Sequence, residues 1–320
     1  MVRRQYTTTA ARAASGHGAK LLRELGEHRS VVDVRFLRGR VRDTRTTCRS
    51  RSSRGCASLR AMSEEMGKAM DEGDWARAHA LFVRQPDAGT PGGIANAALL
   101  LAMAGQYDQA EQQLARTQAP AVEWIVRGDR ARLARWRDPK AAGGLAVARP
   151  TATSPFYAGM AIALLTNDAA LVDKLFTDFG PSFRPVAGRM TLRSGQLRPF
   201  DDLRDSDDAI GQMFEVFVDG TCLYFPYEMV QRITIEPAQS FITLYNHRCQ
   251  IELRGGGVVN GLMPLLYAGS LQSPERFIRT GRETTFSYVG RARRAHGQRD
   301  FVVNGGTMIG MQNVAAIELA

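Results

Sequence analysis

The chain has 320 residues, 44% of them hydrophobic, and no apolar run approaches the ~20 residues that a membrane-spanning helix needs. Its formal charge of +10 would favour a nucleic-acid binder, but residues 1–60 hold 15 Lys and Arg against 4 Asp and Glu. Residues 61–320 hold 27 against 28, so this larger part is almost neutral, which argues against nucleic-acid binding by it.

Residues 1–61 form a basic tail rich in Arg, Ser, Thr and Gly. The tail lacks the periodic apolar face that could offset the entropy cost of ordering, so we expect disorder. Globular patterning begins at Met62. An alternative explanation of the tail is therefore a start site assigned too far upstream.

Residues 62–180 predict a helical, repeat-like domain. Gly73–Ala78 (GDWARA) and Gly105–Ala110 (GQYDQA) form a weak internal repeat offset by 32 residues. This offset is close to the period of tetratricopeptide repeats, in which a small alanine lets two antiparallel helices approach and an aromatic residue fills the space beside it. We expect one such pair of helices over 94–104 and 107–116.

An amphipathic helix is predicted next, within residues 121–139. Its apolar stripe consists of Val122, Ile125, Val126, Leu133 and Trp136, and its opposite side carries Arg127, Arg130, Arg132, Arg135 and Arg137. A basic amphipathic helix can bind a membrane surface or an acidic partner. Because Glu123 and Asp129 interrupt the positive charge, we favour a core helix with a solvated basic face.

The helical part is expected to end near residue 180. A helix is predicted over 156–179, and Gly180-Pro181 is a typical C-terminal stop. Residues 181–204 are interpreted as a linker that leads into an acidic run.

Residues 205–320 predict a β-rich domain, because the hydrophobic period changes from helical to two. Asp219-Gly220 is a type I′ turn signal between two β-rich runs. The resulting hairpin places Phe214, Val216, Val218, Thr221, Leu223 and Phe225 on an apolar face, and Glu215, Phe217, Cys222 and Tyr224 on a mixed face. Further strands are expected at 233–235, 241–245, 250–253, 258–263 and 314–319, with a closing hairpin at 301–309. Short strands at this spacing favour a small barrel or a strongly bent sheet, so the predicted fold class is α+β.

Several short motifs follow one another in a recognisable order within this β-rich part. Their positions are Asp205, Asp207, Gly211, Glu215, Gly220, Pro226, Pro264, Tyr267, Gly269, Ser270, Gly281, Arg282 and Thr284. In this order they resemble the ImpE/SciE/TagJ family, accessory proteins of the bacterial type VI secretion system, over residues 62–320. Two segments depart from the family pattern: Thr243–Asn246 replaces Asp-Leu-x-Trp, and Gly290–Arg294 stands where Gly-x-Gly-Gln-Arg is expected.

The resemblance implies a helical, repeat-like N-terminal half, a β-rich C-terminal half and a non-enzymatic role. That role is to bind the N-terminal helix of the small contractile-sheath subunit and to assist the AAA+ ATPase that disassembles the contracted sheath. The four cysteines, which lack CxxC or Cys/His ligand spacing, favour a reducing compartment. We therefore expect a cytoplasmic protein.

An incoming helix needs an apolar strip with few charges at its centre. Two surfaces offer one in the sequence. The first is the groove between the repeat helices at Leu99, Leu100, Tyr107 and Leu114, and the second is the mixed hairpin face with Phe217, Tyr224 and Tyr227. The sequence does not choose between them.

Two other functions use different parts of the chain. Nucleic-acid binding would act through the basic tail. A metal-dependent hydrolase would use Asp201, Asp202, Asp205, Asp207 and Asp208, because hard cations prefer carboxylate oxygens. This acidic run fails the EF-hand template, since Val216 stands where the bidentate Glu should be. We favour solvated or hairpin-capping carboxylates, and predict no metal, cofactor or catalytic residue.

The location of the charge makes a prediction about nucleic-acid binding. The full chain should bind DNA weakly and in a salt-sensitive manner, and a chain that starts at Met62 should not, because the tail supplies all of the excess positive charge. Salt-dependent binding measurements on both chains test this, with circular dichroism as the control for folding. DNA affinity that survives the truncation would restore the nucleic-acid hypothesis.

Overall fold

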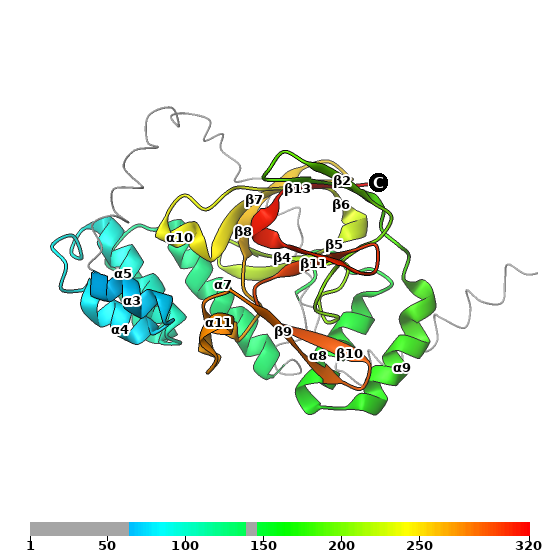
Figure 1. Ribbon diagram of the computed structural model, residues 1–320, viewed down its shortest axis with the longest axis horizontal. Helices are drawn as coiled ribbons and strands as arrows, with labels where there is room; N and C mark the ends of the chain where they lie inside the picture. The colour runs from blue at the N-terminus through cyan, green and yellow to red at the C-terminus, as the bar shows by residue number, and fades with distance from the viewer. Residues whose placement is uncertain (1–63, 139–145) are drawn as a thin grey trace, which may run out of the picture.

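The computed structural model describes residues 64–138 and 146–320, so the predictions for the basic tail lie outside the described residues. Helices occupy the N-terminal part and antiparallel sheets the C-terminal part (Figure 1). The predicted α+β class is thus confirmed. None of the described helices is long and apolar enough to cross a membrane.

Each described helix of the N-terminal part packs against the next helix in the chain. Their bounds are α3 Glu64–Asp71, α4 Trp75–Phe82, α5 Pro91–Met103, α6 Tyr107–Leu114, α7 Pro120–Arg137, α8 Ser154–Thr166 and α9 Ala169–Phe179. Gly73 and Gly105, the first residues of the two repeat segments, have φ of 67° and 80° and turn the chain between paired helices. Ala78 and Ala110 are both fully buried, as close helix approach requires. The tetratricopeptide-like character of these helices stays a prediction.

One predicted helix is interrupted. Residues 156–179 divide into α8 and α9 because Asn167 adopts a left-handed conformation with φ of 54°. The side chain of Asp168 then caps α9 by accepting a hydrogen bond from the Leu171 N–H at 2.9 Å. Polar residues that favour caps over helix interiors account for the break.

The C-terminal part is built from three antiparallel sheets. Its strands are β1 Gly188–Leu192, β2 Leu197–Phe200, β3 Leu203–Asp205, β4 Met213–Val218, β5 Thr221–Pro226, β6 Val230–Ile235, β7 Asn246–Leu253, β8 Val258–Pro264, β9 Thr284–Val289, β10 Ala292–Gly297, β11 Asp300–Val303, β12 Thr307–Gly310 and β13 Val314–Leu319. Eight strands form one sheet in the order β2-β1-β13-β6-β7-β8-β4-β5, three form β12-β11-β3, and β9 and β10 form a hairpin.

The large sheet is open rather than a closed barrel, which corrects the barrel prediction. Its edges are β2 and β5. The β5 edge is covered by Ala146–Ala148, with the Ala148 N–H donating to the Tyr224 carbonyl at 2.8 Å. Pro199 lies in β2, where its missing N–H is tolerated at a sheet edge. The apolar faces of the large sheet and of β3, β11 and β12 enclose one core cluster.

The predicted hairpin has the expected register. Strands β4 and β5 pair Phe214 with Phe225 and Val216 with Leu223, and the turn residues Asp219 and Gly220 have φ of 49° and 75°. The apolar face lies in the sheet core. The mixed face packs against the helices, so both faces of this hairpin are buried.

Two segments differ from their predictions. Residues 181–204, expected to be a linker, contain β1, β2 and the start of β3, because β1 pairs with the distant β13. Residues 241–245, expected to be a strand, form the short helix α10 (Phe241–Leu244). Ser240 and Thr243 form a capping box there, which offsets the β preference of the apolar residues.

Helix α7 approaches β4 closely at Gly128. A Cβ added at this position would lie 2.7 Å from Cδ1 of the buried Phe217 ring, whereas a Cβ at Gly67 in α3 would meet nothing within 4 Å. Gly128→Ala should therefore lower the free energy of unfolding by about 1–3 kcal/mol through overpacking. Gly67→Ala is the matched control and should raise stability by about 0.5–1 kcal/mol. Urea unfolding of both variants checks this, and equal stability of the two would contradict the close approach.

Candidate functional site

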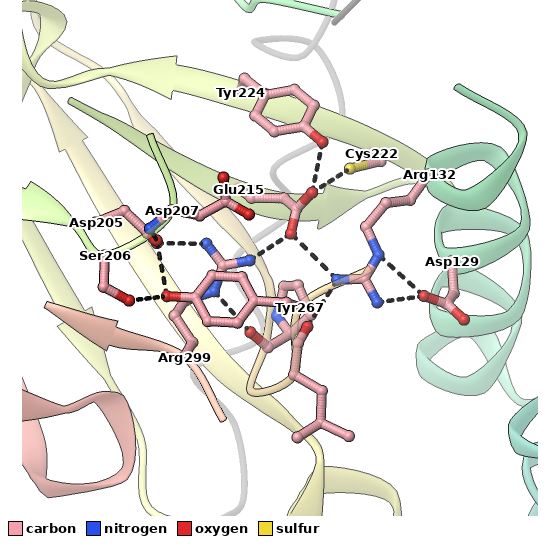
Figure 2. Close-up of polar contacts among 12 residues, drawn as sticks. Asp129, Arg132, Asp205, Ser206, Asp207, Glu215, Cys222, Tyr224, Tyr267 and Arg299 are labelled. Carbon is pink, nitrogen blue, oxygen red and sulfur yellow. Dashed lines mark hydrogen bonds and ion pairs between the residues drawn. The ribbon is translucent and has the colours of Figure 1, made fainter. Parts of the chain in front are cut away.

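A buried network of charged and hydroxyl groups joins α7 to the β-rich part (Figure 2). Its centre is the carboxylate of Glu215 in β4, which points from the mixed hairpin face toward α7. Arg132 of α7 donates from Nη1 to Glu215 Oε2 at 3.1 Å, and Arg299, just before β11, donates from Nη2 to the same oxygen. Glu215 and Arg299 are at most 1% exposed, and Arg132 is 3% exposed. Three chain segments far apart in sequence thus meet at one carboxylate.

On the helical side, Arg132 is fixed by further contacts. Its Nε donates to Asp129 Oδ1 at 3.0 Å and its Nη1 to the Leu266 carbonyl at 2.9 Å. The Tyr107 hydroxyl donates to the other oxygen of Asp129. Helix α6 is therefore linked through Tyr107 to the same network.

On the β side, Arg299 contacts three further groups. Its Nη1 donates to Asp205 Oδ2 at 2.9 Å and its Nε to the Pro264 carbonyl at 3.2 Å. Its guanidinium lies over the Tyr267 ring at 5.1 Å from the centroid. The Tyr267 hydroxyl donates to Asp205 Oδ1 at 2.8 Å. Asp205 Oδ1 also accepts from the Asp207 N–H at 2.9 Å, so both oxygens of Asp205 are satisfied.

The electrostatics of Glu215 and Asp205 differ because their partners differ. Burial would raise the pKa of Glu215, but Arg132 and Arg299 together hold the pKa below its usual value. Burial raises the pKa of Asp205 to about 7, against the opposing effect of Arg299. Burial also raises the pKa of the Cys222 thiol, which lies 3.7 Å from Glu215 Oε1. Cys222 is therefore a poor nucleophile.

Most of the motif positions have a structural role around this network. Asp205, Glu215 and Tyr267 belong to it, Pro264 supplies a carbonyl to it, and Gly211, Gly220, Gly269 and Gly281 have positive φ. Asp207 and Ser270 accept hydrogen bonds from the backbone N–H groups of Ala209 and Gly297, Thr284 donates to the Gln298 carbonyl, and Pro226 ends β5. The ordered motifs of the sequence thus mark a buried framework.

The burial of the two network arginines is not predicted from the sequence. Arg132 was assigned to a solvated helix face, but its charge is buried because Glu215 and Asp129 lie within hydrogen-bond distance. Arg299 belongs to none of the motifs found in the sequence and lies just downstream of the departing segment Gly290–Arg294. Arg299 directly follows a strand, and its buried partner Glu215 lies on the otherwise apolar strand β4. A lone charged residue in an apolar strand is the sequence signal that could have predicted the Arg299–Glu215 pair.

A second set of arginines ties α11 (Arg276–Arg279) to the end of α3. Arg276 Nε donates to the Asp71 carbonyl at 2.9 Å and Arg279 Nη2 to the Glu72 carbonyl at 2.8 Å. Arg282, a motif residue, pairs with the Asp71 carboxylate at 2.6 Å. Cationic groups are favourable at a helix C-terminus. These arginines therefore join the helical and β-rich parts at a place separate from the Glu215 network.

The predicted partner-binding residues are core residues in this structure. Leu99, Leu100, Leu114, Phe217, Tyr224 and Tyr227 are at most 8% exposed, and only Tyr107 is half-buried. Tyr224 donates its hydroxyl to Glu215 and lies under α7. Neither predicted strip is an open surface, because each packs against a neighbouring element. The partner role of these residues stays a prediction. Because Tyr224 is buried, Tyr224→Ala would change the packing of the core and not a surface contact with a partner.

The acidic run does not converge on one point. Asp205 pairs with Arg299, Asp208 accepts from the Arg293 N–H at 2.8 Å, and Asp207 caps a turn. Within residues 64–138 and 146–320, no group of three or more His, Cys, Asp or Glu side chains could hold a metal ion. The hydrolase alternative therefore gains no support.

Two hollows accompany these sites. A cavity of about 20 Å³ lies beside Asp129 and Arg132, between α5, α7 and the β8 end. A cleft of about 420 Å³ lies between residues 182–187, Tyr227 and Arg254. The smaller holds about one water molecule.

Comparison with known proteins gives a family match for most of the β-rich part. Residues 198–318 match the family model described as ImpE protein. Over these residues, called the ImpE region below, the chain is similar to the ImpE family. This region contains Asp205, Glu215, Tyr267 and Arg299, whereas Arg132 and Asp129 lie in α7 outside the matched residues. The network therefore connects the ImpE region to the helices that precede it.

Two known proteins are similar to parts of the chain or to its fold. Over 108 residues the chain is 29% identical to the type VI secretion system accessory component TagJ of Pseudomonas aeruginosa, a match that covers 34% of this chain and 37% of TagJ. The crystal structure of protein VPA1032 from Vibrio parahaemolyticus has a TM-score of 0.65 and 18% identity, and covers 80% of this chain and 97% of that one. At this identity the second likeness shows the fold alone.

The network predicts that Arg132 is far more important for stability than its exposed neighbour Arg130. Arg132→Met removes one partner of two buried carboxylates and should cost about 3–5 kcal/mol of unfolding free energy. Arg130, which is 46% exposed in its pairs with Asp108 and Glu111, is the matched control, and Arg130→Met should cost at most about 1 kcal/mol. Chemical denaturation of both variants measures the difference. Similarly small losses of unfolding free energy in the two variants would show that the buried ion pairs of Arg132 contribute little to stability.

Proposed function

We propose that this protein is an accessory component of a type VI secretion system that binds the N-terminal helix of the small sheath subunit and assists the AAA+ ATPase in sheath disassembly. The observation that carries the proposal is the sequence match to TagJ, a type VI secretion accessory component, together with the match of residues 198–318 to the ImpE model. The match spans 37% of TagJ, so the sheath and ATPase partners are part of the proposal.

The contact surface proposed for the helix lies where α10 meets α11. The Tyr245 hydroxyl at the end of α10 donates to the Thr280 carbonyl at the end of α11 at 3.3 Å. Leu244 of α10 is 39% exposed and Phe277 of α11 is 46% exposed. Both are large apolar side chains next to the joint between the helical and β-rich parts. Exposed apolar anchors of this kind are what an amphipathic helix would cover.

A binding role fits the chemistry of the described residues better than a catalytic one. The charged groups of the network are buried against each other, with their hydrogen-bonding atoms directed at protein partners. A general acid or base must reach a substrate, and these groups are enclosed. The network therefore acts as a support for a binding surface.

The proposal is tested by calorimetric titration with a peptide of the small sheath subunit's N-terminal helix, with a scrambled peptide as reference. Phe277→Ala should weaken binding at least about tenfold, because truncating a central aromatic anchor typically costs about 2 kcal/mol. Tyr288→Ala, at the tip of the β9–β10 hairpin and 64% exposed, is the matched control and should bind like the wild type.

The outcomes separate the family-based proposal from the choice of surface. No heat with the wild-type chain contradicts sheath binding. Binding that is lost in Tyr288→Ala and kept in Phe277→Ala moves the contact to the hairpin tip.

A further inference from the structure

The buried network contains more carboxyl groups than guanidinium groups. Its carboxyl groups are Asp129, Glu215 and Asp205, and its guanidinium groups are Arg132 and Arg299; all five are at most 6% exposed. With every group ionised, the network would hold one uncompensated negative charge. A buried charge without a partner is so costly that the group usually binds or releases a proton instead.

Asp205 is the least compensated of the three carboxyl groups. Glu215 contacts both guanidinium groups, and Asp129 makes two hydrogen bonds with Arg132. Of the two guanidinium groups, Asp205 contacts only Arg299, which it shares with Glu215. A surplus proton is therefore best placed on Asp205.

The groups that surround Asp205 support this placement. The charged and titratable groups that act on Asp205 are Arg299 just before β11, Asp207 in the following turn, Tyr267 after β8 and Tyr227 after β5. Glu215 on β4 and Arg132 on α7 act on Arg299, the guanidinium partner of Asp205. Asp207 adds a second buried carboxyl group two residues away, and Arg294 acts on Asp207 rather than on Asp205. Burial and these neighbours raise the pKa of Asp205 to about 7.

The hydrogen bonds can hold a neutral Asp205 without any heavy atom moving. Oδ1 lies 2.8 Å from the Tyr267 hydroxyl, which lies 2.8 Å from Ser206 Oγ. A proton on Oδ1 would be donated to the Tyr267 oxygen, and the Tyr267 hydroxyl would turn to donate to Ser206. Oδ2 still accepts from Arg299, and Oδ1 still accepts from the Asp207 N–H.

We propose that Asp205 is a proton-binding site built into the joint between α7 and the β-rich part: its neutral form balances the charge of the network, and loss of the proton weakens the joint. The Arg132–Glu215 contact carries this effect to α7, because Arg299 is shared between Asp205 and Glu215. The joint is thus tighter in the proton-bound form.

The direction of the pH dependence follows from proton linkage. The folded-state pKa of Asp205 lies above the ordinary value of 3.8, so the folded state keeps a proton that the unfolded chain has lost. The stability from this proton is fully present below the ordinary pKa and is lost as pH rises through about 7. Stability should therefore fall across the neutral range.

The test is the melting temperature of the full chain and of D205N between about pH 5.5 and about pH 8.5. The wild type should lose stability relative to D205N, so that the difference in melting temperature changes by about 4 °C across the range. D201N removes an exposed carboxyl group and should follow the wild-type profile. A difference between D205N and wild type that does not change with pH overturns the proposal.

A second variant covers the case in which D205N does not fold. D129N removes the surplus negative charge at the other end of the network, so Asp205 can ionise without leaving the network unbalanced. This variant should also flatten the pH dependence seen in the wild type. A D129N profile that still falls by the wild-type amount overturns the charge-balance argument.

Discussion

Two guanidinium groups share the carboxylate of Glu215, and the arrangement of the helical and β-rich parts depends on this contact. Neither Arg132 nor Arg299 could be buried without a charged partner, and Glu215 could not stay ionised in the core without them. Because α7 supplies Arg132 and the residue before β11 supplies Arg299, the contact fixes the helix against the sheet at one position. Apolar packing alone would tolerate small shifts of α7 along the sheet, whereas directed hydrogen bonds specify one position of the helix.

The packing around the network also holds the helices in one position against the β-rich part. Gly128 lets α7 lie directly on the Phe217 ring, whose face also contacts Arg132 at 5.4 Å from the centroid. The arginines of α11 hold the end of α3 at a second point. A binding surface that spans both parts, as proposed for α10 and α11, needs such a fixed geometry, since ordering two moving parts would reduce affinity.

Local pattern was enough to predict the elements whose residues signal their own conformation. Asp219-Gly220 fixed the hairpin and its register, and the stripe from Val122 to Trp136 gave α7 nearly to its ends. Strands β1 and β3 were not predicted because they are short and depend on pairing with β13 and β11, more than 90 residues away, and β2 pairs with β1. The motif positions Asp205, Glu215 and Tyr267 were found in the sequence, but their convergence with Arg132 was not. Pairing between distant charged side chains leaves no periodic signal in a single sequence.

A double-mutant cycle on Arg132 and Glu215 tests the central claim most directly, with unfolding free energies measured for Arg132→Met, Glu215→Gln and the double variant. Because both single variants break the same buried contact, the account predicts strong non-additivity, with a coupling of about 2–3 kcal/mol. Losses that add to within about 0.5 kcal/mol would contradict it, and would show that apolar packing, not the shared carboxylate, holds α7 against the sheet.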